Sequence, residues 1–241
     1  MAGIRIRPSE HLLILGKTGS GKTFTTKNVL MKALRKQKNN IIVVLDPKQE
    51  YEDLTPNVAF SPKQLNEILY ADERPNIEGP DIIRAIVGEP TEAAAEEYLR
   101  AAWGPFADIR EGTHYKPNFG VRFFIEDMPV FYDSAYQTPP MLKRWVTMGR
   151  APQRTIVATS QRAQLIPKTV ITMVDHLFVF RVSEYDGKRV IKEYYGDKAS
   201  YAVSNIPKFG YVLISDLYEE PIVFDPFRPS VKPKTEEGVE L

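Results

Sequence analysis

Short hydrophobic runs alternate with segments of helical pattern along most of the chain. Residues 41–45 form a β-branched run without polar alternation, which is typical of a strand buried on both faces. Comparable apolar runs predict further strands at residues 12–15, 82–87, 121–125, 155–159, 177–182, 211–214 and 222–224. This alternation predicts an α/β fold with a mostly parallel sheet flanked by helices, and we expect the last two strands to be antiparallel edge strands.

Two segments carry the periodicity of amphipathic helices. Residues 23–38 place Leu30 and Leu34 on one face and most of their lysines elsewhere. Residues 91–103 form the second predicted helix, which begins with glutamate-rich turns. We expect two asparagines, Asn39 and Asn40, to end the first helix before the strand at residues 41–45.

The composition of the chain sets broad limits on its class. A length of 241 residues suits one α/β domain, and we predict that residues 1–225 form it. The rest, residues 226–241, is rich in Pro, Lys and Glu and predicts a flexible tail. With 32 Lys and Arg against 31 Asp and Glu, no strong overall field attracts a polyanion, although basic groups lining one surface could still bind nucleic acid.

Two absences in the sequence exclude particular kinds of site and segment. The chain has no cysteine, which excludes disulfides and thiolate metal sites and suits an intracellular protein. No stretch approaches about 18 consecutive apolar residues, so we expect no transmembrane segment, and any membrane contact would be peripheral.

A glycine-rich segment lies between the first predicted strand and the first predicted helix. It fits the phosphate-binding loop pattern G-x-x-x-x-G-K-[ST] and consists of Gly16, Lys17, Thr18, Gly19, Ser20, Gly21, Lys22 and Thr23. Glycines let backbone N–H groups surround a phosphate at the positive end of a helix. We expect Lys22 to reach the β- and γ-phosphates and the Thr23 hydroxyl to hold Mg²⁺. The sequence therefore predicts a site for a nucleoside triphosphate.

Acidic residues follow two of the predicted strands. Glu126 and Asp127 come directly after residues 121–125, where a phosphate loop needs an acid to hold Mg²⁺ through water and to orient the attacking water. By position Glu126 would take the metal side and Asp127 the water, but such motors usually have Asp before Glu, so this division stays open. The two acids could also only cap the strand. Asp46 and Glu50 follow residues 41–45, either near the same site or as part of a turn.

Polar residues also surround the predicted strand at residues 155–159. The amide of Gln161 offers a donor and an acceptor that could bind the γ-phosphate or the attacking water. An arginine at a subunit edge could reach a neighbouring site and stabilise charge in the transition state. Arg150, Arg154 and Arg162 are the candidates, although arginines in such positions are more often solvated surface side chains.

In their order along the chain, these motifs resemble those of the FtsK/HerA superfamily of ring-forming DNA-translocating ATPases. Besides the phosphate loop and the acid pair, the resemblance covers residues 42–51, 149–162, 175–182 and 206–213. It implies a RecA-like P-loop fold in which Lys22 and Thr23 bind ATP and Mg²⁺, and Glu126 and Asp127 serve the metal and the hydrolytic water. It further implies that Gln161 is a polar sensor and that Arg150, with Arg162 in reserve, acts on the adjacent subunit.

Within this superfamily, the small size of the chain resembles the genome-packaging ATPases of membrane-containing double-stranded DNA viruses. The resemblance implies a homo-oligomeric ring, a hexamer or pentamer, that uses ATP to drive duplex DNA into a preformed capsid. DNA contacts would be sequence-independent, and a capsid vertex, a portal and internal membrane proteins are candidate partners. The location implied is the virion or the host cytoplasm.

Other functions remain open at this stage. One alternative is a cellular or plasmid DNA translocase of the segregation or conjugation type, and another is an ATP-dependent assembly factor that does not move DNA. The candidate DNA contacts are basic pairs, Lys143-Arg144 and Lys188-Arg189. Three aromatic residues near the basic pair at 143–144 either stack on DNA or belong to the core, namely Tyr132, Tyr136 and Trp145.

Overall fold

A nine-stranded sheet organises the computed structural model, which describes residues 6–37, 39–70, 81–104, 119–182 and 185–225. The strands are β1 (Leu12–Leu15), β2 (Asn40–Leu45), β3 (Val58–Ala59), β4 (Ile82–Ala85), β5 (Gly120–Ile125), β6 (Arg154–Ser160), β7 (His176–Phe180), β8 (Tyr211–Ser215) and β9 (Ile222–Phe224). Their order in the sheet is β3-β4-β2-β5-β6-β1-β7-β8-β9. All pairs from β3 to β7 are parallel, whereas β8 runs antiparallel to β7 and β9 antiparallel to β8. The predicted fold class, with its late antiparallel strands, is confirmed.

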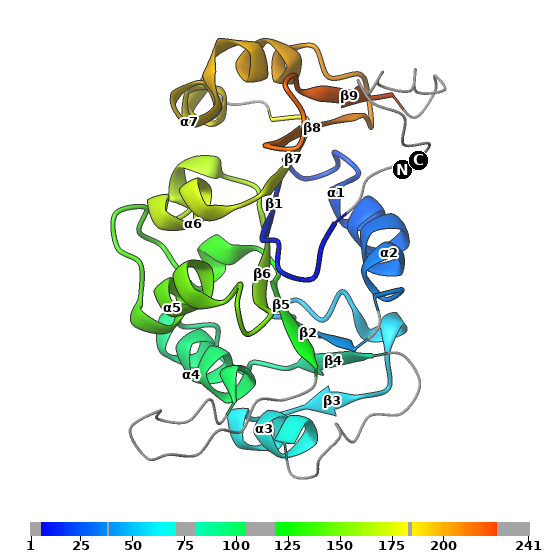
Figure 1. Ribbon diagram of the computed structural model, residues 1–241, viewed down its shortest axis with the longest axis vertical. Coiled ribbons are helices and arrows are strands. Elements are labelled where there is room, and N and C mark those ends of the chain that lie inside the picture. The colour runs from blue at the N-terminus through cyan, green and yellow to red at the C-terminus, as the bar shows by residue number, and fades with distance from the viewer. Residues whose placement is uncertain (1–5, 38, 71–80, 105–118, 183–184, 226–241) are drawn as a thin grey trace.

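Helices cover both faces of this sheet (Figure 1). They are α1 (Lys22–Thr25) and α2 (Lys32–Leu34), joined by a π-helical segment (Thr26–Met31), then α3 (Pro62–Tyr70), α4 (Glu92–Trp103), α5 (Pro140–Met148), α6 (Lys168–Met173) and α7 (Tyr185–Ser204). The helical run from α1 to α2 lies on one face, and α4, α5 and α6 lie on the other. Among the described residues, none of the helices has the length and apolar character needed to span a membrane.

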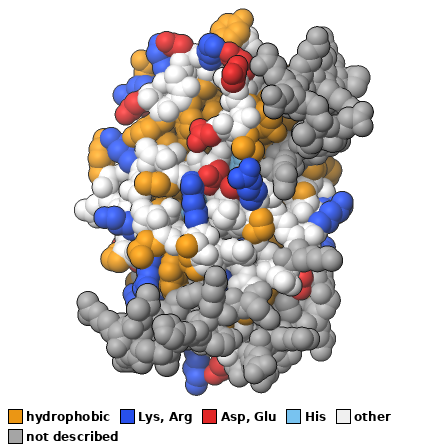
Figure 2. All heavy atoms as spheres, in the orientation of Figure 1, with side chains coloured by type: hydrophobic (Ala, Val, Ile, Leu, Met, Phe, Trp, Pro, Cys, Tyr) orange, Lys and Arg blue, Asp and Glu red, His pale blue; other side chains and the backbone are white. Residues whose placement is uncertain are grey.

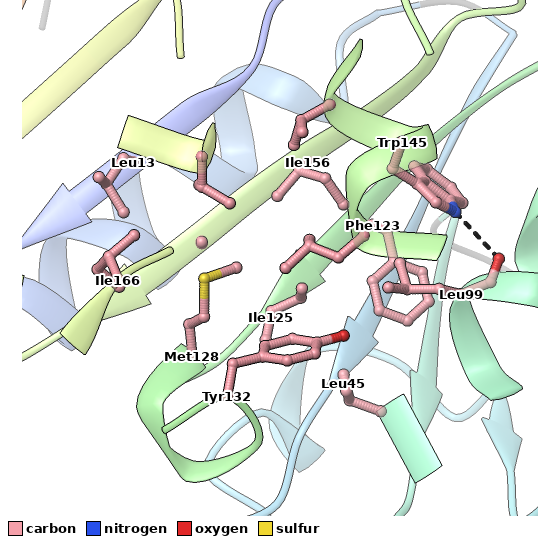
Figure 3. Packing of buried hydrophobic residues seen from close by; sticks show 14 of the residues in the cluster. Leu13, Leu45, Leu99, Phe123, Ile125, Met128, Tyr132, Trp145, Ile156 and Ile166 are labelled. Carbon is pink, nitrogen blue, oxygen red and sulfur yellow. Dashed lines mark hydrogen bonds between the residues drawn. The ribbon is translucent and has the colours of Figure 1, made fainter. Parts of the chain in front are cut away.

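Because both faces are covered, successive residues of one strand enter different hydrophobic clusters. Leu13 of β1 packs in the cluster beneath α4 and α5, together with Phe123 and Trp145, whose indole N–H donates to the Leu99 carbonyl at 3.0 Å (Figure 3). Leu12 packs on the other face, in the cluster beneath the α1–α2 run. The apolar runs at residues 12–15 and 121–125 therefore mark central strands of the sheet.

Several predicted boundaries were wrong, and some elements were not predicted. The first helical run ends at Leu34, and Asn39 has a left-handed φ of 55°; Lys38, the last residue of the predicted helix, is outside the described residues. The strand expected at residues 82–87 ends at Ala85. The tail predicted at residues 226–241 is outside the described residues. The elements missed by the sequence interpretation are β3, α3, α5, α6 and α7, the last of which is broken by non-helical backbone at Gly196.

Arg154 corrects one expectation about the arginines. This side chain, expected at the surface or in a neighbouring site, is fully buried at the start of β6. Its guanidinium donates to the carbonyls of Trp103 at 3.3 Å and Phe119 at 3.0 Å, and to the Tyr70 hydroxyl at 3.2 Å. Arg154 therefore joins α3, α4 and β6 inside the fold and is not an arginine that could reach another subunit.

Candidate nucleotide site

Residues 16–21 form a tight loop between β1 and α1 at the carboxyl edge of the parallel strands, and Lys22 and Thr23 are the first two residues of α1. The Gly16 N–H donates to the Ser160 carbonyl at 3.0 Å, and the Lys17 N–H donates to the Arg181 carbonyl at 3.2 Å. These bonds tie the start of the loop to the ends of both neighbouring strands. A Cβ atom on Gly16 would lie 2.6 Å from Cβ of Phe180, so no side chain fits there.

The loop leaves donors available where the helix begins. Gly19 and Gly21 have φ values of 74° and 90°, in the left-handed region that favours glycine. Gly21 is the N-cap of α1 and supplies no side-chain cap, and the first turn contains no acidic residue. The first N–H groups of a helix have no intrahelical acceptor, and the helix dipole adds positive potential there. The Ser20 hydroxyl is also buried without a hydrogen-bond partner. Both features suit an anion.

A cavity of about 260 Å³ opens beside this loop. The residues that line it are Lys17, Thr18, Gly19, Gly21, Lys22, Thr23, Phe24, Lys48, Glu50, Glu126 and Gln161. Most of the predicted phosphate loop therefore meets Glu126 and Gln161 around one space.

The strand register explains how Glu126 reaches the loop. Leu45 of β2 pairs with Ile125 of β5, so the residues after both strands emerge side by side. Glu126 Oε1 lies 3.7 Å from Lys22 Nζ, and Glu126 Oε2 accepts a hydrogen bond of 2.8 Å from the Tyr51 hydroxyl. Burial raises the pKa of Glu126, and the charge of Lys22 and the Tyr51 hydrogen bond reduce this effect without cancelling it.

Asp127, the second acid of the pair, belongs to a polar network that does not include Glu126. Its backbone has a left-handed φ of 53°, and its N–H donates to the Thr159 hydroxyl at 2.8 Å. Its Oδ2 accepts from the Gln161 amide at 3.3 Å and from the Lys48 ammonium. Gln161 Oε1 in turn accepts from the Thr18 hydroxyl at 2.7 Å. This Lys48–Asp127–Gln161–Thr18 network connects the ends of β2, β5 and β6 to the phosphate loop.

Lys48 balances the two acids electrostatically. Burial opposes its charged form, but the hydrogen bond and charge of Asp127, with Glu126 and Glu50 nearby, outweigh burial and raise the pKa of Lys48. The ammonium therefore stays charged at neutral pH and holds Asp127 in one orientation.

Asp46 and Glu50 were each predicted to lie near the site or to form part of a turn, and the structure gives the two residues different roles. Asp46 is fully buried; its carboxylate accepts from the N–H groups of Glu50 and Tyr51, each at 3.0 Å, and lies 3.4 Å from Arg84 Nε. It therefore builds the turn after β2. Glu50 lines the cavity.

Arg150 is the predicted site residue that the structure places elsewhere. It precedes β6, whereas Gln161 follows it, and a strand of seven residues spans about 20 Å. Arg150 Nη2 lies 2.7 Å from Asp175 Oδ1 at the amino edge of the sheet, and 57% of its side chain is exposed. Arg150 cannot act on the cavity of its own subunit, so its predicted action on a neighbour stays a prediction.

Lys48 and Tyr51 lie within residues 42–51, which the family resemblance covers, but no role is predicted for either of them from the sequence. A signal for them existed, because both follow a strand predicted to end at the same sheet edge as residues 121–125. What the sequence could not supply is the pairing of β2 with β5, which brings the Tyr51 hydroxyl to Glu126 and the Lys48 ammonium to Asp127.

Comparison with known proteins places this site in a family. Residues 4–145, more than half of the chain, match the family model described as "Helicase HerA, central domain". The chain belongs to this HerA family. The resemblance inferred from the motifs is thereby confirmed, and membership identifies the chain as a P-loop ATPase.

Similar proteins support the same fold assignment. The genome packaging NTPase of Sulfolobus turreted icosahedral virus 2, in complex with ATPγS, is 14% identical, with a TM-score of 0.73 over 92% of this chain and 100% of that chain. VirB4 of Thermoanaerobacter pseudethanolicus is 10% identical, with a TM-score of 0.54 over 91% of this chain and 92% of that chain. An uncharacterized protein of Aquifex aeolicus (strain VF5) is 46% identical over 43 residues, which is 18% of this chain and 16% of that protein.

Proposed function

We propose that this chain hydrolyses ATP in the cavity beside residues 16–23 and uses the energy to move double-stranded DNA. The observation that carries the hydrolytic part is the placement of two acids in two different networks. Glu126 lies between Lys22 and Tyr51, and Asp127 is bonded to Gln161 and Lys48. One carboxylate therefore faces the phosphate loop while the other is held beside a polar amide.

The oxygen atoms around Lys22 fit Mg²⁺, the metal that the family implies. Mg²⁺ prefers oxygen ligands and binds through one or two carboxylates together with substrate phosphates. The Thr23 hydroxyl and the Glu126 carboxylate would hold it, directly or through water. When bound, the ion would neutralise charge on the β- and γ-phosphates.

Each protein group would then have its own role in hydrolysis. Lys22 and the N–H groups of residues 16–23 would bind the phosphate oxygens, and Gln161 would orient a water molecule against the γ-phosphorus. As the new P–O bond forms, the bond from the γ-phosphorus to the ADP oxygen breaks. Asp127, held by Lys48, would accept the proton that the water loses. This assigns the metal side to Glu126 and the water side to Asp127.

Movement of DNA is the part of the proposal that rests on likeness. The HerA family match and the fold shared with a genome packaging NTPase support it, and packaging of a viral genome by a ring of subunits is the specific form that we favour. Two of the three aromatic candidates for DNA stacking, Tyr132 and Trp145, are buried in the core, while Tyr136 is 84% exposed. Lys143 and Arg144 are exposed on α5.

The charges on the surface bear on where DNA could lie. On the face in Figure 2, Lys and Arg side chains are interspersed with Asp and Glu and form no continuous basic surface among the described residues. Contacts between this face and DNA phosphates would therefore come from a few residues per subunit, and a ring would add them together.

The test is the ATPase rate of the purified chain with and without double-stranded DNA at low salt. We expect DNA to stimulate the rate, and Lys22→Ala to abolish it by removing the phosphate-binding cation. If the chain hydrolyses ATP but neither binds DNA nor is stimulated by it, the translocase proposal is wrong and an assembly factor becomes the better description. Uptake of DNA into preformed capsids would separate packaging from cellular or plasmid translocation.

Mixing subunits tests Arg150. If Arg150 acts on the adjacent subunit, Arg150→Ala subunits should reduce the rate of a mixed ring more than their fraction predicts. The matched control is Arg7→Ala, which removes an arginine that is 60% exposed and faces Glu10 at 3.7 Å. A rate that falls only in proportion to the mutant fraction would contradict a role for Arg150 in a neighbouring site.

A further inference from the structure

The direction of the phosphate chain determines where the rest of the nucleotide lies, if the proposed function is correct. The reacting end must face Glu126, Asp127 and Gln161, which follow β5 and β6 on one side of β1. The nucleoside is attached to the opposite end of the triphosphate. It must therefore leave the cavity on the opposite side of β1, over β7 and β8.

A loop on that side reaches the phosphate loop. Because Tyr211 at the start of the antiparallel strand β8 pairs with Phe180 at the end of β7, residues 205–210 lie at the carboxyl edge of the sheet. Within this loop, Cδ1 of Phe209 lies 3.7 Å from the position that a Cβ atom on Gly21 would occupy. The Phe209 ring therefore lies beside the end of the phosphate loop, on the side where the nucleoside must emerge.

Phe209 has a conformation and an exposure that packing does not explain. Its φ is 62°, a left-handed value that is a strained outlier for a bulky residue. Even so, 48% of the side chain is exposed, so the strain does not serve to bury the ring. The Lys208 ammonium lies 5.2 Å from the ring centroid. Phe24 adds a second aromatic group that lines the cavity and is 70% exposed.

We propose that Phe24 and Phe209 form an aromatic shelf that stacks against the base of the bound nucleotide. Each ring is exposed beside the phosphate loop, and base stacking on aromatic side chains needs only an accessible π-face. The shelf would bind the nucleotide through the base, separately from the phosphate contacts of residues 16–23. Because every base has a π-face, this binding mode predicts similar affinities for ATP and GTP.

Comparison of ATP with inorganic tripolyphosphate tests the shelf, because tripolyphosphate has the phosphates but no base. We expect Phe209→Ala to weaken ATP binding about 10- to 100-fold and to leave tripolyphosphate binding unchanged. Phe209→Tyr should restore ATP binding, since a phenol keeps the aromatic face. The matched control is Phe60→Ala, which removes a ring with the same 70% exposure as Phe24 from the loop after β3, at the far end of the sheet.

The outcomes distinguish this inference from the proposed function beneath it. Unchanged ATP affinity in both Phe24→Ala and Phe209→Ala would overturn the shelf and leave the nucleotide site intact. An equal loss for ATP and tripolyphosphate would also overturn it, because the rings would then only support the loop. A wild-type chain that binds neither ligand would overturn the proposed function and the shelf together.

Discussion

His11 provides a prediction about stability whose size follows from the structure. It is fully buried directly before Leu12 of β1, and its Nδ1 accepts a hydrogen bond of 3.0 Å from the Ile156 N–H. Its backbone N–H donates to Asp175 Oδ2 at 2.7 Å. Burial, followed by the positive charges of Arg150 and Arg122, lowers the pKa of His11 from 6.5 to about 4, with the Val146 carbonyl acting in the opposite direction.

The sign follows from which state binds more protons. Between pH 4 and 6.5 the unfolded chain protonates this imidazole while the folded chain keeps it neutral, so the stability contribution present above pH 6.5 is lost as the pH falls. At pH 5, with a free pKa of 6.5 and a folded pKa of about 4, the linkage relation gives a loss of about 2 kcal/mol relative to pH 7. Below pH 4 the loss approaches about 3 kcal/mol.

Urea unfolding of the wild type and of His11→Gln at pH 7 and pH 5 measures this loss. Glutamine keeps an acceptor for Ile156 and does not titrate, and the other titrating groups cancel in the difference between the two proteins. We expect the wild type to lose about 2 kcal/mol more than the variant on acidification. An equal loss in both proteins would refute the reasoning. If His11→Gln does not fold, an NMR titration of the wild type gives the same answer, because the His11 imidazole should remain neutral at pH 5.

Three substitutions test the geometry of the nucleotide site. Gly16→Ala places a methyl group 2.6 Å from Cβ of Phe180, so we expect ATP affinity, measured by calorimetry, to fall at least about tenfold, and unchanged binding would contradict the tight loop. Tyr51→Phe removes the hydrogen bond of 2.8 Å to Glu126 and keeps the ring contact with Phe124. Urea unfolding should therefore show that the free energy of unfolding falls by about 1.5–3 kcal/mol. An unchanged free energy of unfolding would mean that Glu126 does not depend on this donor. Lys48→Met frees Asp127 from its cation, so kcat should fall about tenfold or more with little change in KM, while Lys48→Arg keeps a charged donor and should retain part of the rate.

The parts of the fold that the sequence predicted well are those in which local pattern and tertiary environment agree. The runs that form β1, β2 and β5 are apolar because both faces of a central strand are covered. The glycines of residues 16–23 could be interpreted because every phosphate loop needs a backbone that bends closely around the phosphate. α5 and α6 were missed because they are short and begin at or next to proline, and α7 was missed because Gly196 divides its periodicity. β3 has only two residues and leaves almost no pattern to detect.

The same distinction separates the site residues that could be predicted from the sequence from those that could not. The motif located Lys22, and the ends of predicted strands located Glu126 and Gln161, because these positions need only the order of elements along the chain. The partners of these residues depend on which strands are neighbours, and β2 pairs with β5 although β3, α3, β4 and α4 lie between them in sequence. For Arg154 the sequence predicted the wrong environment. A charged side chain is normally expected at the surface, and only the structure shows the buried carbonyl groups to which Arg154 donates.

On the proposed function, the arrangement of the strands would let this site couple ATP hydrolysis to motion. The residues around the cavity follow different strands, so a change in the ligand at Gln161 would reach the ends of β6, β5 and β2 together through the Lys48–Asp127–Gln161–Thr18 network. Thr18 lies in the phosphate loop, so a γ-phosphate oxygen that accepts from the Thr18 hydroxyl in place of Gln161 Oε1 would break the Thr18–Gln161 hydrogen bond and release one end of this network. Hydrolysis would restore the bond. On the proposed function, the site would have two states that differ by a small set of hydrogen bonds at the edge of the sheet, and this difference would transmit the chemical step to neighbouring elements.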